Sequence, residues 1–249
     1  MIDIDKYKLV IFDLDGTVYH GDSLIDGAKD AIELLRKRGC IVVFLTNNSA
    51  KCGMQIADKL CRLGIELDSE DVWTVADIAA EYLAAYNASD VYVCGTAALR
   101  ERVASRGVML VKPDKARCLL IGFNPEATYQ DCADAVSAAL GAETIIACNK
   151  ERIYPGDHGC MLPGCGAMVA SVEWCSSKPV DLIIGKPSSR LLDTLALHYG
   201  CRPSEMIMVG DSRESDIAMA DGFGCDSLLV GEQEDPERTR MRDIASYLK

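Results

Sequence analysis

The sequence predicts an α/β protein with a Rossmann-like parallel sheet core and an inserted smaller α/β cap domain. Short apolar runs rich in Val, Ile and Leu alternate with longer amphipathic segments, which is typical of buried parallel strands joined by helices. The pattern occurs near both ends of the chain, and the stretch between them has strand and helix signals of its own. Long structureless loops are rare inside compact domains, so this stretch is expected to fold around a separate core.

The N-terminal part begins with an apolar run at residues 8–12 that is too short for a core helix and ends at polar residues. We therefore interpret it as a buried strand. Residues 26–39 form an amphipathic segment that ends in basic residues and glycine, which predicts a helix and its stop. A second strand is expected at residues 40–45 and a second helix at residues 51–63, ending at Gly64.

The C-terminal third repeats this alternation. Its expected strands lie at residues 182–184, 206–209 and 227–230, and its expected helices at 188–199, 214–221 and after Pro236. The middle stretch has expected strands at 91–94, 118–121 and 144–147, and expected helices at 97–105, 129–140 and 167–175. The predicted core therefore comprises residues 1–77 and 180–249, and the predicted cap residues 78–179.

Composition narrows the classes of function. The 249 residues are 49% hydrophobic, and 38 acidic against 26 basic side chains give a net charge of −12. This composition argues against disorder, nucleic-acid binding and anionic membranes. The N-terminus does not have the pattern of a signal peptide and no apolar stretch approaches the ~18 residues of a membrane span, so a cytoplasmic protein is expected. The 12 unevenly spaced cysteines are then expected to be free thiols, and the pair Cys160 and Cys165 lacks the further ligands of a zinc site.

Polar motifs follow four of the expected strands: DLDGT at residues 13–17, TNNS at 46–49, GKP at 185–187 and GDSRESD at 210–216. Each alone is compatible with a turn, a helix cap or a solvated loop charge. Ligands bind at the carboxyl ends of parallel strands, so we expect these four ends to meet in one sheet. Together they supply carboxylates, a hydroxyl with backbone amides and an ammonium, which is the inventory for phosphoryl transfer with magnesium.

In this order, and with the insert after the second, the motifs resemble those of the haloacid dehalogenase superfamily, in particular its phosphatase branch. The likeness to the NagD-like, para-nitrophenylphosphatase-type subgroup, which has a large α/β cap, covers nearly the whole chain. It includes VYVCG at 91–95, GFNPEATY at 122–129, ACN at 147–149, YPGDHGCMLPGCGAMVASVE at 154–173 and IGKPS at 184–188. Caps of this type resemble ones that pair in dimers, which makes a homodimer through the cap a candidate assembly, but the sequence does not give the oligomeric state.

The charges of these side chains, and the positions they can reach from the strand ends, suggest their catalytic roles, and the resemblance implies the same roles. Asp13 is the expected nucleophile, because a carboxylate needs no base to attack phosphorus at neutral pH. Asp15 is the expected acid and base, which protonates the leaving oxygen and later deprotonates water. Thr46, the backbone N–H of Asn47 and Lys186 are expected to hold the phosphate, with Lys186 also restraining the nucleophile.

Adjacent carboxylates repel a phosphate dianion, which indicates a bound divalent cation. Magnesium prefers oxygen ligands and retains several waters, so Asp13, the Asp15 carbonyl and Asp211 suffice as protein ligands. Asp216 is expected to orient metal-bound water. The expected cofactor is therefore Mg²⁺, and the expected partner is a small phosphate ester.

The cap is expected to choose the leaving group, and residues 163–166 are candidates for substrate contact. Two places depart from the pattern of the relatives. Asn149, Lys150 and Glu151 stand where many have Asn-Pro-Asp, and Gly231 with Glu232 replaces the usual Thr-Gly.

The predicted function is magnesium-dependent hydrolysis of small organic phosphate monoesters through an aspartyl-phosphate. Nucleotides, sugar phosphates, glycerol phosphate and pyridoxal phosphate remain open as substrates. One alternative is a phosphotransferase that passes the phosphoryl group to another alcohol, and a second is a catalytically silent binding or regulatory protein. Dehalogenation is the weakest alternative, because a halide leaving group needs neither the second aspartate nor the metal.

Overall fold

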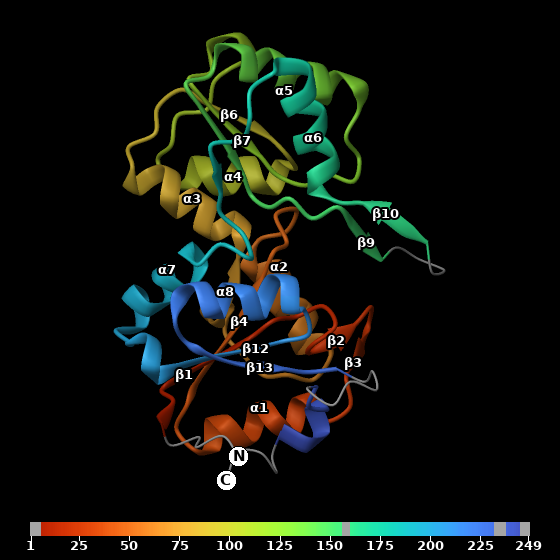
Figure 1. The fold of residues 1–249 in the computed structure, drawn as a ribbon, viewed down its shortest axis with the longest axis vertical. Helices are drawn as coiled ribbons and strands as arrows, with labels where there is room; N and C mark the ends of the chain where they lie inside the picture. The colour runs from red at the N-terminus through yellow and green to blue at the C-terminus, as the bar shows by residue number, and fades with distance from the viewer. Residues whose placement is uncertain (1–5, 156–159, 232–237, 245–249) are drawn as a thin grey trace. The chain divides into compact units, whose positions relative to one another are not determined.

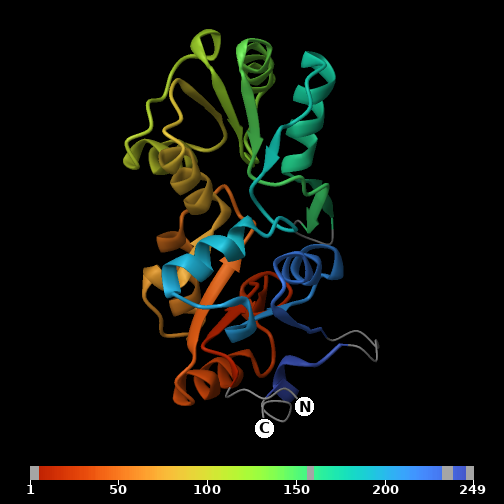
Figure 2. The same cartoon turned by 60° about the vertical axis from the view of Figure 1, so that its left-hand side comes forward.

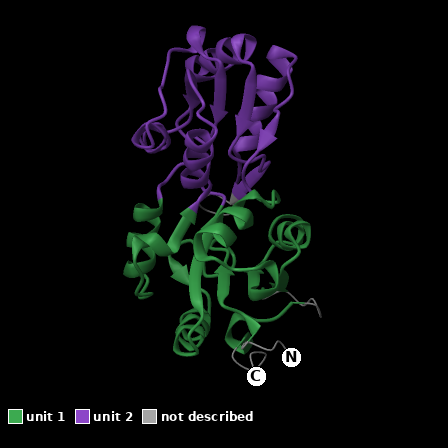
Figure 3. Cartoon of the chain, turned by 90° about the vertical axis from the view of Figure 1, so that its left-hand side faces the viewer, with its two compact units in different colours: residues 1–46, 53–73, 186–249 green, residues 47–52, 74–185 purple. Residues whose placement is uncertain are grey.

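A computed structural model describes residues 6–155, 160–231 and 238–244 of the chain. The chain divides into two compact units (Figure 3): unit 1 comprises Met1–Thr46, Gly53–Trp73 and Lys186–Lys249, and unit 2 comprises Asn47–Cys52 and Thr74–Gly185. Unit 2 is thus inserted into unit 1. The chain passes from one unit to the other at residues 46/47, 52/53, 73/74 and 185/186, whereas the boundaries predicted from the sequence lie at residues 77/78 and 179/180.

Unit 1 is built on a five-stranded sheet in the order β13-β12-β1-β4-β5. Its strands are β1 (Leu9–Phe12), β4 (Ile41–Thr46), β5 (Val72–Thr74), β12 (Met206–Gly210) and β13 (Asp226–Leu229). The central strand β1 runs parallel to both neighbours, with Phe12 opposite Val209 of β12 and Phe44 of β4. All of β1 is buried, as expected for a strand covered on both faces. The carboxyl ends of β1, β4 and β12 therefore lie at one edge of the sheet.

Helices cover both faces of this sheet. The helices of unit 1 are α1 (Ala28–Lys37), α2 (Gly53–Arg62), α7 (Arg190–Tyr199) and α8 (Ala218–Phe223). Ile32 and Leu35 of α1 and Leu60 of α2 share one buried core with Phe12 and Phe44. Figure 1 shows α1 and α8 on opposite sides of the strands. A short hairpin of β2 (Tyr19–His20) and β3 (Ser23–Leu24) follows the first strand.

Unit 2 has its own four-stranded parallel sheet in the order β11-β8-β7-β6. Its strands are β6 (Val91–Cys94), β7 (Cys118–Ile121), β8 (Thr144–Ala147) and β11 (Leu182–Ile183), and its helices are α3 (Val75–Ala85), α4 (Ala97–Ser105), α5 (Tyr129–Gly141) and α6 (Cys165–Ser176). Helices α3 and α4 pack together, as do α5 and α6, on opposite faces of the sheet (Figure 2). A second hairpin is formed by β9 (Ile153–Pro155) and β10 (Met161–Pro163).

One expectation about the sheets is wrong. The strand expected at residues 182–184 was assigned to the core, but β11 pairs with β8 of unit 2, with Leu182 opposite Ile146. The backbone N–H of Gly185 still donates to the carbonyl of Cys148 at 2.7 Å, and Lys186 is the first residue of unit 1. The four polar motifs therefore do not follow four strands of one sheet. Lys186 belongs to unit 1, although the strand that precedes it belongs to the sheet of unit 2.

Other elements differ from the expectation at the C-terminal side. The helix expected at 214–221 consists of a π-helical turn at Arg213–Ile217 followed by α8. Of the last helix expected after Pro236, the described residues contain the 3₁₀ turn Met241–Asp243, and the rest falls outside the described residues. Strand β5, helix α3 and both hairpins were not expected.

All 12 cysteines lie within the described part of the chain and are free thiols, as expected. Among the described helices, none is both long and apolar enough to cross a bilayer.

Candidate active site

Three aspartates of unit 1 form a carboxylate cluster at the carboxyl edge of the sheet. Asp13 directly follows β1, and Asp211 and Asp216 follow β12, the parallel neighbour of β1. One carboxylate oxygen from each lies within 4.8 Å of the others. Asp216 is 1% exposed, and the other two are half-buried. The structure thus brings together three of the predicted site residues.

Two glycines make this close approach of carboxylates feasible. Gly16 has φ +89°, and a Cβ there would lie 2.4 Å from Oδ2 of Asp211. A Cβ on Gly210 would lie 2.3 Å from Cγ of Asp216. Any larger residue at either position would displace a carboxylate, and at Gly16 it would also adopt a backbone conformation that side chains disfavour. The DGT and GDS segments therefore need glycine for space.

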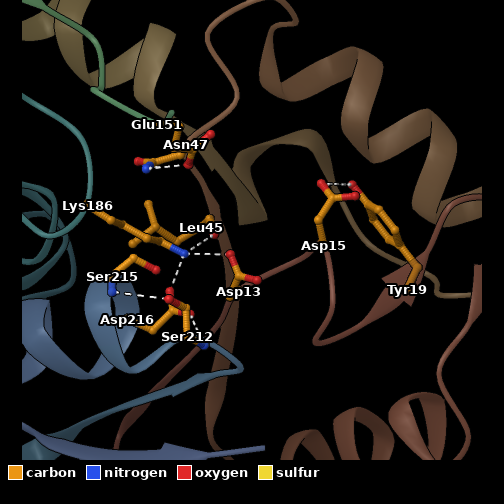
Figure 4. A network of polar contacts seen from close by, with 10 residues as sticks. All are labelled: Asp13, Asp15, Tyr19, Leu45, Asn47, Glu151, Lys186, Ser212, Ser215 and Asp216. Atoms are coloured by element: carbon orange, nitrogen blue, oxygen red, sulfur yellow. Dashed lines mark hydrogen bonds and ion pairs between the residues drawn. The ribbon is translucent and has the colours of Figure 1, made fainter. Parts of the chain in front are cut away.

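Lys186 joins the cluster as a buried cation. Its Nζ lies 2.6 Å from Oδ1 of Asp13 and 2.7 Å from Oδ1 of Asp216, and it donates to the carbonyl of Leu45 at 3.1 Å (Figure 4). The residue is 4% exposed. Burial lowers the pKa of Lys186, but the charges of Asp13 and Asp216 outweigh that effect and raise it above its ordinary value. The ammonium is therefore held charged between the two carboxylates.

Burial lowers the pKa of an ammonium but raises the pKa of a carboxyl group. It is the largest cause that raises the pKa of Asp13 to about 8, with a further increase from the charge of Asp216, while Lys186 opposes the shift. Burial, followed by the charge of Asp216, also raises the pKa of Asp211. Lys186 thus compensates only part of the negative charge at the cluster.

The residues present fit a divalent cation. Partly buried carboxylate oxygens are the ligands that hard cations such as Mg²⁺ prefer. Three carboxylates come together with one ammonium, so a bound cation would offset the remaining negative charge. The carboxylates of Asp13, Asp211 and Asp216 could hold it. Asp216, which was expected only to orient metal-bound water, thus lies close enough to be a ligand itself, and the Asp15 carbonyl stays a predicted ligand.

Asp15 is separated from this cluster. Its side chain is exposed, and its Oδ2 accepts a hydrogen bond from the hydroxyl of Tyr19 at 3.3 Å (Figure 4). Burial, together with the charge of Asp15, raises the pKa of Tyr19, so the phenol remains a donor. An exposed carboxyl oriented by a phenol is suited to exchanging protons with a leaving group and with water.

Thr46 is the last residue of β4 and is 5% exposed. Asn47 follows it and is the first residue of unit 2. Its carbonyl accepts from Nδ2 of Asn149 at 2.8 Å, Oδ1 of Asn149 accepts from the backbone N–H of Glu151 at 3.0 Å, and Oε1 of Glu151 accepts from Nδ2 of Asn47 at 2.8 Å. We call these three residues the linker ring. It fixes the residue whose N–H was predicted to hold phosphate.

The predicted substrate-contact segment lines a cavity within unit 2. Pro163, Gly164 and Cys165 contribute to a cavity of about 260 Å³, together with Phe123 and Tyr154. The rings of Phe123 and Tyr154 meet edge to face, with centroids 5.1 Å apart. The cavity is thus largely apolar on this side.

Sequence reasoning missed several residues of the site. Ser212, whose backbone N–H donates to Asp216 at 3.1 Å, lay within a recognised motif but was given no role. Glu151 was noted only as a departure from the relatives, and its contact with Asn47 spans 104 residues. Arg238, which donates to the carbonyl of Asp211 at 2.8 Å, lies outside every motif. Only the spacing of Ser212 within GDSRESD offered a local signal.

A Rossmann-like sheet with an inserted α/β unit, a cluster of three carboxylates and a buried lysine is typical of enzymes that transfer phosphoryl groups. The chain belongs to the haloacid dehalogenase-like hydrolases. The family description "Haloacid dehalogenase-like hydrolase" matches residues 10–109, and "HAD-hydrolase-like" matches residues 183–246.

Individual relatives agree with this assignment. The chain is 35% identical over 223 residues to the sugar-phosphatase AraL of Bacillus subtilis, covering 89% of this chain and 82% of the relative. It is 32% identical over 226 residues to the acid sugar phosphatase of Staphylococcus aureus, covering 90% and 86%. The resemblance to the phosphatase branch of the family, drawn from the motifs, is thereby confirmed.

Solved structures show the same fold. A 4-nitrophenylphosphatase from Thermotoga maritima superimposes with a TM-score of 0.91 at 27% identity, covering 99% of each chain. A glycerol phosphate phosphatase from Mycobacterium tuberculosis, determined in complex with magnesium, has a TM-score of 0.85 at 30% identity and covers 96% of this chain and 75% of its own. The predicted fold class, a parallel α/β core with an α/β cap, is confirmed.

Proposed function

We propose that this chain is a magnesium-dependent phosphatase that hydrolyses small organic phosphate monoesters, with sugar phosphates as the first candidates. The observation that carries the proposal is the convergence of Asp13, Asp211, Asp216 and Lys186 at one edge of the sheet of unit 1. The sugar phosphatases and the glycerol phosphate phosphatase among its relatives support the substrate class.

The first chemical step uses Asp13 as the nucleophile. Lys186 holds Oδ1 of Asp13 at 2.6 Å, which restrains the carboxylate for attack. A new bond forms between a carboxylate oxygen and phosphorus, and the bond from phosphorus to the ester oxygen breaks. Asp15 gives its proton to that oxygen, so the products are an alcohol and an aspartyl-phosphate.

The second step returns the enzyme to its starting state. Asp15, now ionised, takes a proton from water, which attacks phosphorus and breaks its bond to Asp13, releasing inorganic phosphate. Thr46 and the N–H of Asn47 bind phosphate oxygens during both steps. Bound Mg²⁺ supplies positive charge that offsets repulsion between the carboxylates and the phosphate dianion. Lys186 supplies the remaining positive charge.

The test is turnover of a panel of sugar, polyol and nucleoside monophosphates with magnesium, with both products measured. Equal amounts of released phosphate and alcohol are expected, whereas alcohol in excess of phosphate would indicate transfer to another acceptor. Asp13→Asn should lose turnover of para-nitrophenyl phosphate while remaining folded, as checked by circular dichroism. Turnover near wild type in this variant, or full turnover after removal of divalent cations by EDTA, would contradict the proposal.

A further inference from the structure

Gly231, one of the two places where the sequence departs from the expected family pattern, lies next to the side chain of Arg238. Val230, which directly follows β13, forms a β-bridge with Thr239. The N–H of Thr239 donates to the carbonyl of Leu229 at 2.9 Å, and the N–H of Gly231 donates to the carbonyl of Thr239 at 3.1 Å. This pairing brings Arg238 to the carboxyl end of the sheet.

Arg238 joins two neighbouring strand ends through one nitrogen. Its Nη1 donates to the carbonyl of Asp211 at 2.8 Å and to the carbonyl of Val230 at 2.9 Å. Asp211 follows β12 and Val230 follows β13, and the N–H of Val230 donates to the carbonyl of Gly210 at 2.9 Å. A guanidinium with fixed N–H directions is well suited to such bridging, because its planar geometry leaves little freedom once the contacts form.

Gly231 provides the space for this guanidinium. It has φ +151°, and a Cβ there would lie 2.8 Å from Nη1 of Arg238 and 3.3 Å from its Cδ. A residue with a side chain would therefore move the guanidinium away from the two carbonyls. Gly231 and Arg238 therefore act as a pair, and the bound guanidinium gives a physical reason for glycine at position 231.

The contact is made to the backbone of Asp211, and not to its carboxylate. The Asp211 side chain instead faces Gly16, where Oδ2 occupies the position next to the missing Cβ. Lys186, in contrast, contacts the carboxylates of Asp13 and Asp216 directly. The two cations therefore have different tasks: Lys186 compensates charge, and Arg238 holds the main chain from which a carboxylate projects.

We propose that Arg238 is a positioning residue that fixes the main chain at Asp211, so that its carboxylate stays with those of Asp13 and Asp216 as a ligand set for a divalent cation. This inference rests on the metal site of the proposed function. Asp211 is the member of the set that follows β12 directly, and a shift of its backbone moves its carboxylate by a comparable distance. Residues that orient metal ligands typically change metal affinity by about 10- to 100-fold when they are mutated.

The experiment measures Mn²⁺ binding by electron paramagnetic resonance of the free ion, which does not require enzymatic turnover. Arg238→Met keeps an apolar stem and removes the donors, and Gly231→Ala displaces the guanidinium. Both should raise the Mn²⁺ dissociation constant by about 10-fold. Arg238→Lys retains a cationic donor and should bind more tightly than Arg238→Met. The matched control is Arg242→Met, because Arg242 belongs to the same segment but pairs at the surface with Asp26 at 3.4 Å; its affinity should stay within about 2-fold of wild type.

Thermal unfolding of each variant reports whether it is folded, and Gly231→Ala provides an independent route if Arg238→Met fails to fold. Wild-type affinity in both variants would overturn the inference, as would the absence of Mn²⁺ binding by the wild-type protein. A protein that binds Mn²⁺ in the Arg238-dependent manner but turns over no phosphate ester would refute the proposed function while leaving this inference intact.

Discussion

Removal of the buried ammonium of Lys186 is the perturbation whose size the structure defines best. Lys186→Met preserves an unbranched apolar stem but leaves Asp13 and Asp216, 2.6 and 2.7 Å from Nζ, without their cation. Breaking a buried ion pair by removing one partner typically costs about 3–5 kcal/mol. At about 2–4 °C per kcal/mol for a chain of this size, the melting temperature should fall by about 10 °C.

The loss of stability caused by Lys186→Met should also increase as the pH rises. The pKa of Asp13 is raised to about 8, so the folded protein binds its proton more tightly than the unfolded chain, and stability falls as the pH rises toward that value. Lys186 opposes this fall because it stabilises the ionised carboxylate. The destabilisation by Lys186→Met should therefore grow between about pH 6 and about pH 9.

The assay is thermal unfolding followed by circular dichroism without divalent cations. Lys8→Met is the matched control, because Lys8 pairs with Glu205 at 2.6 Å but its side chain is 64% exposed, and surface pairs contribute little. Equal melting temperatures for Lys186→Met and wild type at the higher pH, or a larger loss at the lower pH, would refute the reasoning.

Three further predictions concern the cation and the phosphate. Cation binding requires ionised Asp13, whose pKa is about 8, so the affinity for Mn²⁺ should rise between about pH 6 and about pH 8 and binding should release protons. Titration calorimetry in two buffers measures both quantities, and an affinity that does not change with pH would contradict this prediction. Gly16→Ala should weaken Mn²⁺ binding about 10-fold or more, because the added Cβ would displace the Asp211 carboxylate. The control Gly21→Ala should not weaken it, because Gly21 also has a positive φ but no atom within 4 Å of an added Cβ. Equal affinities in the two variants would contradict the steric argument. Glu151→Ala breaks the linker ring and should raise the inhibition constant of inorganic phosphate by about 3-fold, and Glu151→Gln, which keeps an acceptor, should restore it; no change in Glu151→Ala would exclude this role.

Much of the fold could be predicted because buried parallel strands have a clear local pattern. The strands β6, β7 and β8 have the bounds expected from the sequence. The failure at β11 has a physical cause: a two-residue apolar strand has the same pattern in either sheet, and only its pairing with β8 assigns it to unit 2. Pairing partners far apart in the sequence are not encoded in local periodicity.

The site shows the same division between local and long-range information. Asp13, Asp211, Asp216 and Lys186 could be proposed from short motifs, because carboxylates after strands are recognisable one at a time. Arg238 could not, because its role depends on the bridge between Thr239 and Val230, which no local sequence pattern indicates.

The most direct test of the central claim is to trap the covalent intermediate. The protein is mixed with excess substrate and magnesium, quenched during turnover and treated with borohydride, which reduces an acyl phosphate to the alcohol, and the peptides are then analysed by mass spectrometry. The account predicts homoserine in place of aspartate at residue 13 and at no other position. Sustained phosphate release with an unmodified Asp13, or with the label on a different residue, would contradict it.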